Sequence, residues 1–206
     1  GEISLLKLFE GNMSPVLTGE VALTDLIYYV VRGGWPSDVG VSKAACGNTA
    51  KEYLKTVVDD DMFNTDGVQR DVKKVWALLH SLGRNESTIV TNATLMRDIS
   101  DSGDERVDRD TIADYLNIFN RLFLIDDQPA FNTKLLSSRR IMKSAKRHFV
   151  DPSLAVAALG ATQEMLYNDL NTFGFLFEAL CEHDLKIYAK TIGANMFHYS
   201  DEKGSE

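Results

Sequence analysis

Apolar side chains recur at helical spacing along much of this chain, which predicts a mostly helical protein. The clearest stretch covers residues 72–82, where the apolar positions are Val72, Val75, Trp76, Leu79 and Leu82. Positions three or four residues apart lie on one face of a helix, and Gly83 follows as a stop. A second stripe begins after Asp108 or Asp110 as N-cap and consists of Ile112, Tyr115, Leu116, Phe119 and Leu122. We expect these two faces to pack against each other.

The same pattern predicts helices on both sides of this central pair. Gly33-Gly34-Trp35-Pro36 stops a helix on the N-terminal side, and Asp151-Pro152 opens one on the C-terminal side, because proline suits the first helical position. An acidic loop is expected over residues 59–66. The further helices are predicted at 23–31, 42–58, 94–99, 154–159, 163–170 and 172–188.

Two short extended segments are predicted after the second stripe. The first covers residues 123–125, and the second covers 134–142 after a turn at Asp126-Asp127-Gln128-Pro129. Three helices followed by a β-hairpin is the order of a winged helix-turn-helix. We therefore expect such a unit over residues 68–145.

The C-terminal end of the chain has the composition of one more strand. Met196 to Tyr199 is strand-like, and Asp201 to Gly204 is turn-like. Since a lone strand cannot satisfy its own backbone hydrogen bonds, we expect this segment to be poorly ordered or to pair with another molecule. Together with the missing initiator Met, this leads us to interpret the chain as a piece of a longer protein.

Composition places the chain among ordinary folded proteins. Its 206 residues are 44% apolar and 25% charged, which suits one or two compact domains. No apolar run approaches the roughly 18 residues that a membrane helix needs, so no membrane association is expected. Cys46 and Cys181 lie far apart without metal-binding spacing, which favours a reducing cytoplasmic location.

Positive charge is concentrated in one part of an acidic chain. The net charge is -8, yet residues 128–150 contain six basic side chains and no acidic one: Lys134, Arg139, Arg140, Lys143, Lys146 and Arg147. This basic stripe is the candidate nucleic-acid-binding element, since cations on a hairpin neutralise backbone phosphates. The alternative is a solvated face, or an intramolecular contact with acidic surface elsewhere.

The expected third helix is poorly suited to reading bases. Asp108, Asp110 and Asp114 repel the phosphate backbone, and Arg109 and Arg121 are the remaining anchors. Sequence-specific readout through this helix is therefore not predicted, and an acidic third helix also suits a protein-binding surface.

The residues do not form a recognisable catalytic constellation. A phosphate-binding loop of the form Gly-x4-Gly-Lys-[Ser/Thr] is missing from the sequence. Asp59-Asp60-Asp61 with Asp66 lacks the alternating ligands, central glycine and closing glutamate of a calcium loop. Cys181-Glu182-His183-Asp184 cannot converge, because consecutive helical residues point in different directions. Glu178 is the metal candidate that remains, with a solvated or capping glutamate as the alternative.

Several segments stand in the order found in one protein family. With these segments the chain resembles the uncharacterised domain that follows the P-loop module in many bacterial and archaeal AAA-type ATPases. The segments are Gly1-Glu2-Ile3-Ser4-Leu5, Arg32-Gly33-Gly34-Trp35-Pro36, Leu78 to Asn85, Thr111 to Leu116, Phe123-Leu124-Ile125, Lys146 to Asp151 and Gly174 to Glu178.

The resemblance implies a mostly α, α+β chain in three parts. Residues 1–67 would be a helical connector after an absent ATPase module, 68–145 the winged helix, and 146–206 the truncated start of a restriction-nuclease-like α/β core. ATP and Mg²⁺ would belong to the absent module, and no cofactor is expected in this chain.

The implied function is that of a non-catalytic accessory part of the ATPase. It would couple the nucleotide cycle to a nucleic-acid or protein target through non-specific phosphate contacts. One alternative is a protein–protein interaction module that binds no nucleic acid. Another is a free-standing winged-helix DNA-binding regulator, which would need neither the Gly33 to Pro36 turn nor an α/β start.

Overall fold

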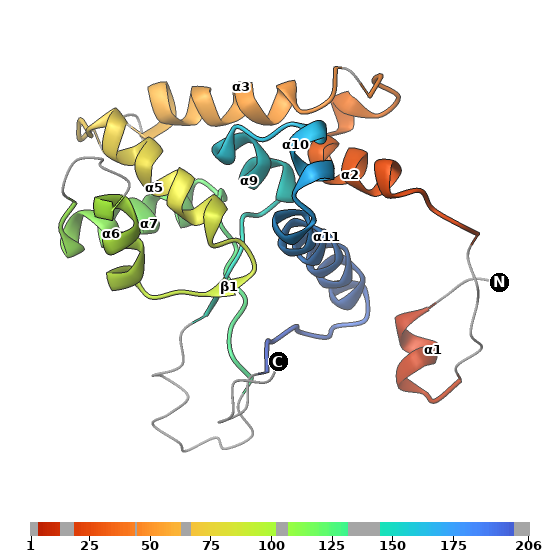
Figure 1. Cartoon of the computed structure of the whole chain (residues 1–206). Coiled ribbons are helices and arrows are strands. Elements are labelled where there is room, and N and C mark those ends of the chain that lie inside the picture. The colour runs from red at the N-terminus through yellow and green to blue at the C-terminus, as the bar shows by residue number, and fades with distance from the viewer. Residues whose placement is uncertain are drawn as a thin grey trace, which may run out of the picture.

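Helices dominate the computed structural model of the chain (Figure 1). The structure describes residues 4–12, 19–43, 45–62, 67–101, 107–131 and 145–199. In order, the elements are α1 (Leu5–Phe9), α2 (Leu23–Arg32), η1 (Pro36–Asp38), α3 (Asn48–Thr56), η2 (Val57–Asp61), α5 (Val72–Arg84), β1 (Thr88–Ile89), α6 (Asn92–Asp101), α7 (Arg109–Arg121), β2 (Lys146–Arg147), α9 (Pro152–Leu159), α10 (Gln163–Asn168) and α11 (Leu170–Thr191).

Aspartate side chains determine where the central helices begin. Asp108 accepts a hydrogen bond from the Thr111 amide at 2.7 Å and so starts α7, which selects Asp108 over Asp110 as the cap. Asp151 accepts from the Ser153 amide at 2.9 Å and starts α9, with Pro152 at the first helical position as predicted. These contacts satisfy amides that have no partner inside their own helix.

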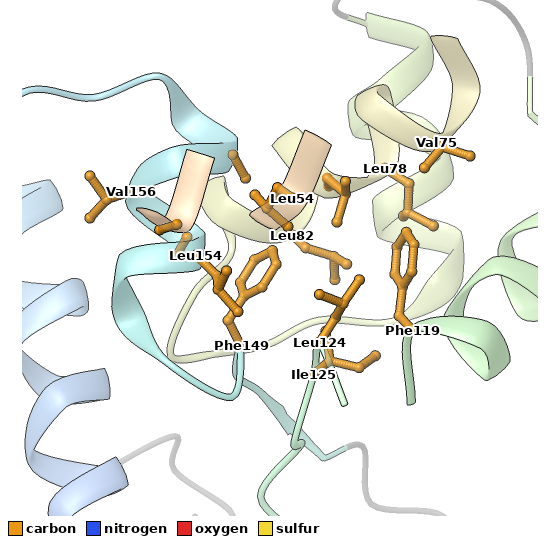
Figure 2. Packing of buried hydrophobic residues seen from close by; sticks show 14 of the residues in the cluster. Leu54, Val75, Leu78, Leu82, Phe119, Leu124, Ile125, Phe149, Leu154 and Val156 are labelled. Carbon is orange, nitrogen blue, oxygen red and sulfur yellow. The ribbon is translucent and has the colours of Figure 1, made fainter. Parts of the chain in front are cut away.

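The helix α9 is the centre of the hydrophobic core. It packs against α5, α3, α2 and α11, and its Leu154 and Ala155 have no exposed surface. Figure 2 shows Leu154 near Leu82 of α5 and Phe149. Gly83 lets α5 approach α9 closely, because a Cβ atom there would lie 3.0 Å from the Leu159 side chain.

The two predicted apolar faces at 72–82 and 112–122 share this core, as expected. Val75, Leu82 and Phe119 belong to the same buried cluster (Figure 2). Val72 is the exception, since it stands at the first position of α5 and is 45% exposed. The cluster also contains residues of α2, α3, α9 and α11, so the three predicted regions of the chain contribute to one core.

A small antiparallel sheet joins α5 and α7 to the C-terminal helices. β1 pairs with β2 in the register Thr88↔Arg147 and Ile89↔Lys146. The other edge of β2 continues through antiparallel bridges Gln128↔Lys146 and Ile125↔Phe149. The predicted strand at 134–142 lies outside the described residues. Of the strand predicted at 123–125, only Ile125 joins the sheet. Phe123 instead has a left-handed backbone (φ 54°) that ends α7.

The described part of the C-terminal segment, up to residue 199, pairs within its own chain. This corrects the expectation that it would be poorly ordered or bind another molecule, while residues 200–206 lie outside the described residues. His198 forms a parallel bridge with Ala130. Its amide donates to the Pro129 carbonyl at 3.0 Å, and its carbonyl accepts from the Phe131 amide at 2.7 Å. The backbone groups of this residue therefore find partners in the 129–131 segment.

One helix prediction and one loop prediction also need correction. The helix predicted at 42–58 begins only at Asn48, because Gly47 holds a left-handed conformation (φ 85°) just before it. The acidic residues Asp59 to Asp61 lie in the π-helical η2 rather than in a loop, and Asp66 lies outside the described residues. Among the residues that the structure describes, none of the helices has the length and apolar character needed to cross a membrane.

Candidate functional site

The described end of the basic stripe is tied to acidic side chains of the same molecule. Lys146 on β2 is buried, and its Nζ lies 2.5 Å from Glu178 Oε1 on α11. Arg147 forms an ion pair with Asp127 and donates to Asn92 Oδ1 at 2.9 Å. At this end, the basic stripe therefore makes the intramolecular contacts with acidic groups that were the alternative to nucleic-acid binding. The other four cations, Lys134, Arg139, Arg140 and Lys143, lie outside the described residues.

Further polar contacts fasten α11 to the sheet on the same side. Ser87 Oγ donates to the Phe175 carbonyl at 2.9 Å, and Lys186 Nζ lies 2.6 Å from Asp126 Oδ2. With the Lys146–Glu178 pair, these contacts form what we call the α11 junction. Glu178, the metal candidate from the sequence, therefore neutralises a buried lysine.

A buried His–Glu pair lies next to this junction and was not identified from the sequence. His148 Nδ1 and Glu86 Oε1 are 3.0 Å apart, and Glu86 Oε2 accepts from the Phe149 amide at 3.0 Å. Burial raises the pKa of the Glu86 carboxyl, although His148 and the backbone amides of Phe149 and Ser87 act in the opposite direction. In the sequence, Glu86 comes directly after the Leu78 to Asn85 segment. No motif or spacing in the sequence predicts its contact with His148.

The His148–Glu86 pair has no space for a substrate. The hollow beside it, lined partly by Leu82 and Ile125, holds no volume for a water-sized group. Each of the two side chains is only 2% exposed. The pair therefore holds the sheet against α5, and a role as general acid or base would require an opening that this hollow lacks.

The exposed face of α7 carries two of the acids predicted for this helix, together with an amide and an arginine. Asp110, Asp114, Asn117 and Arg121 are all exposed. Asp114 Oδ2 accepts a hydrogen bond from Arg70 Nε at 3.1 Å. This face has mixed charge, and its acids oppose approach to a phosphate backbone.

The turn at Gly33 to Pro36 meets the start of α9. The Gly34 amide donates to Asp151 Oδ2 at 2.8 Å, and Trp35 Nε1 donates to Ser153 Oγ at 2.9 Å. Gly33 has φ 69° and ψ -171°, a conformation essentially restricted to glycine. Two segments quoted for the family resemblance are thus in direct contact, although 117 positions separate Gly34 from Asp151.

The acidic and Cys/His runs do not assemble into a metal centre. Within the described ranges, no group of three or more His, Cys, Asp or Glu side chains is placed to hold a metal ion. In the Cys181 to Asp184 run, His183 Nδ1 lies 3.3 Å from Asp184 Oδ1, while Cys181 is exposed.

An open hollow of about 510 Å³ lies between α9, α10 and the start of α11. Leu159, Met165 and Leu166 provide its apolar lining, with Glu164 and Asp169 among its polar groups. Its lining includes neither a histidine nor a cysteine.

Comparison with known proteins gives a family match but no function. A family model described as a domain of unknown function (DUF8612) matches residues 23–165, from the start of α2 into α10. No match was found among the curated proteins or among the solved structures. The matched stretch includes the Gly33 to Pro36 turn, α7, the sheet and α9. Because it covers more than half of the 206 residues, the chain belongs to the DUF8612 family of domains of unknown function.

Proposed function

We propose that the chain is a non-catalytic winged-helix module that contacts nucleic-acid phosphates as an accessory part of an AAA-type ATPase. The order α5, β1, α6, α7 supports the winged helix, because a winged helix has two further strands after its third helix. In this proposal the segments near 125–128 and 146–149 correspond to those two strands. β2, which belongs to the second segment, lies between the first segment and β1.

The observation that carries the proposal is the bridge between Gln128 and Lys146. It pairs the two residues that flank positions 129–145, and in this proposal that connection corresponds to the wing. The sequence of this connection contains four basic residues and no acidic one: Lys134, Arg139, Arg140 and Lys143. Cations on such a connection attract phosphates without reading bases.

The described contacts favour binding that does not depend on base sequence. Lys146 and Arg147 are occupied by Glu178 and Asp127, which leaves phosphate contact to the four cations of the connection. The acids on α7 oppose its insertion into the major groove. We therefore assign positioning, rather than base recognition, to this module.

The link to an AAA-type ATPase rests on the resemblance. The Gly33 to Pro36 turn contacts Asp151, and Lys146 contacts Glu178, so these quoted segments converge near α9 and α11. In this proposal, ATP and Mg²⁺ belong to a separate P-loop module, and this chain transmits its nucleotide cycle to the target.

Titration of a fluorescent DNA duplex into the chain tests the proposal. We expect binding at low salt that weakens steeply at physiological salt, by up to about 0.9 log units per log unit of salt for each phosphate contact. Replacing Lys134, Arg139, Arg140 and Lys143 with glutamine should abolish it.

The matched control replaces four exposed cations elsewhere, Lys51, Lys55, Lys73 and Arg97, with glutamine. It makes the same change in net charge and should retain most of the binding. Equal losses in both variants, or no binding by the wild type at low salt, would reject the phosphate-contact role.

A protein-interaction module is the second candidate, and the exposed face of α7 favours it. That face combines Asp110 and Asp114 with Asn117, which suits hydrogen bonding to a complementary protein surface better than contact with phosphates. The absence of duplex binding at low salt, with the chain folded, would favour this second function.

A further inference from the structure

The exposed side of α7 carries a stripe of polar residues whose order is complementary to itself. Asp110, Asp114, Asn117 and Arg121 follow one another at intervals of four, three and four residues, so they lie on one side of the helix. All four are exposed. The stripe thus has an acid at its N-terminal end and a cation at its C-terminal end.

A second α7 running antiparallel to the first would match this stripe. If a two-fold axis passes between residues 115 and 116, Asp110 lies opposite Arg121 of the second copy, and Asp114 lies opposite Asn117. The two-fold axis repeats each contact, which is the property of an isologous interface. Both ends then carry an opposite-charge pair, and the centre carries two carboxylate–amide contacts.

The groups needed for this pairing are available. Within the described part of the chain, Asp110 and Arg121 have neither a side-chain hydrogen bond nor an ion pair. Asp114 uses Oδ2 for Arg70, and its side chain is still 52% exposed. Its other oxygen therefore has access to the amide of Asn117 in the second copy.

Phe123 adds apolar surface at the end of the stripe. It is 77% exposed and has φ 54°. Its amide donates to the Asn120 carbonyl at 3.1 Å, and the Leu124 amide donates to the Phe119 carbonyl at 2.8 Å, which is the Schellman arrangement. Glycine is favoured at this left-handed position, and the Phe123 ring contributes nothing to the core.

Exposed valines lie beside the other end of the stripe. Val68 and Val72 are 52% and 45% exposed. Arg70 connects their segment to α7, because it donates to Asp114 and, through Nη1, to the Val68 carbonyl at 3.1 Å. In an antiparallel pair, Phe123 of one copy approaches this apolar end of the other copy.

We propose that α7, with Phe123 and Val72 at its two ends, is a symmetric contact surface between two copies of this chain. This inference goes beyond the proposed phosphate contacts, which use the 129–145 connection. One face of a 13-residue helix buries little surface, so the dimer is expected to be weak and dependent on protein concentration. Its exposed charge pairs also make it weaker at high salt.

The order of charges along α7 also stabilises the helix of a single copy. An acid in the first turn and a cation in the last turn interact favourably with the helix dipole. Loss of dimer in a single charge variant therefore needs a control for folding. Mixing two variants provides it, because mixing cannot repair a folding defect.

The test measures sedimentation equilibrium of the wild type, Asp110→Arg and Arg121→Asp over a range of concentrations. Each variant alone places like charges opposite each other at both ends, so its dimer should be at least about tenfold weaker than that of the wild type. An equimolar mixture should restore dimers. In the mixed dimer, the arginine introduced at position 110 of one copy faces the aspartate introduced at position 121 of the other, while the native Asp110–Arg121 pair remains at the second end.

Two further variants complete the test. Arg97→Asp changes an exposed cation on α6 and should leave the dimer constant unchanged. Phe123→Gly should weaken the dimer while raising the thermal midpoint of the monomer, since glycine suits the left-handed position. A wild type that stays monomeric at all concentrations, or a mixture no more dimeric than its components, would overturn the proposal.

Discussion

At the scale of single residues, Gly33 shows how one backbone position joins distant parts of the chain. Its positive φ and extended ψ turn the chain after α2 and bring Gly34 within 2.8 Å of Asp151. A methyl group at Gly33 would approach Ser153 Oγ to 2.4 Å and Asp151 Oδ1 to 2.5 Å. The glycine is required both by its own conformation and by the space it leaves for α9.

We predict that Gly33→Ala destabilises the protein by at least about 2 kcal/mol, because backbone strain and steric overlap add. Gly40→Ala is the matched control, since Gly40 also has a positive φ (83°) but a methyl group there would meet no other atom within 4 Å. It should cost only about 1 kcal/mol. Urea denaturation measures the change in unfolding free energy of both variants. Equal changes would show that the contact of Gly33 with α9 does not contribute to stability.

At the scale of elements, α11 depends on polar contacts as well as on apolar packing. Its first half contributes Phe173 and Leu176 to the core, whereas Leu185 and Tyr188 in its second half are exposed. The α11 junction is what holds this long helix against the sheet. The buried end of that junction is the Lys146 side chain, whose ion-pair partner Glu178 is itself 47% exposed.

We predict that Glu178→Gln destabilises the protein by about 1 kcal/mol, because it leaves the ammonium of Lys146 without this counter-charge. Solvent around the half-exposed Glu178 keeps the loss below that of a fully buried pair. Amide hydrogen exchange in α11 should become faster, as the helix opens more often. Glu164→Gln, on the exposed face of α10, should change neither the stability nor the exchange rate. Unchanged exchange in α11 of the Glu178→Gln variant would contradict the role of the α11 junction.

At the scale of the whole molecule, one core unites regions that the sequence divided into three. Figure 1 shows α9 between α3 and α5 on one side and α10 and α11 on the other. Residues from α2 to α11 belong to one buried cluster. A shared core favours unfolding as a single cooperative unit.

We predict that the two tryptophans report the same unfolding midpoint. Trp35 lies in the turn before η1, where its ring centroid is 5.1 Å from that of Tyr53, and Trp76 lies on α5. The variants Trp35→Phe and Trp76→Phe leave one reporter each, in two different predicted regions. After correction for any change in stability, fluorescence and circular dichroism midpoints should coincide. Separate midpoints would mean that the regions unfold independently.

Much of the helical architecture follows from local patterns. The stripes at 72–82 and 112–122 specify α5 and α7, and Asp108 and Asp151 mark helix starts by capping amides. The start of α3 was predicted too early, because the left-handed Gly47 was not identified as the boundary. The terminal strand was predicted without a partner inside the chain, because sheet pairing between residues 130 and 198 has no local signal.

The sequence by itself determined which segments are helical and which faces are apolar, because helix formation depends on neighbours three and four residues away. It also located the positive charge. Only the tertiary structure decided that Lys146 and Arg147 form ion pairs with acidic side chains of their own molecule, and that Glu86 and His148 form a buried pair. The physical reason is that ion pairs and burial depend on how separate elements meet in space, which periodicity along the chain does not encode.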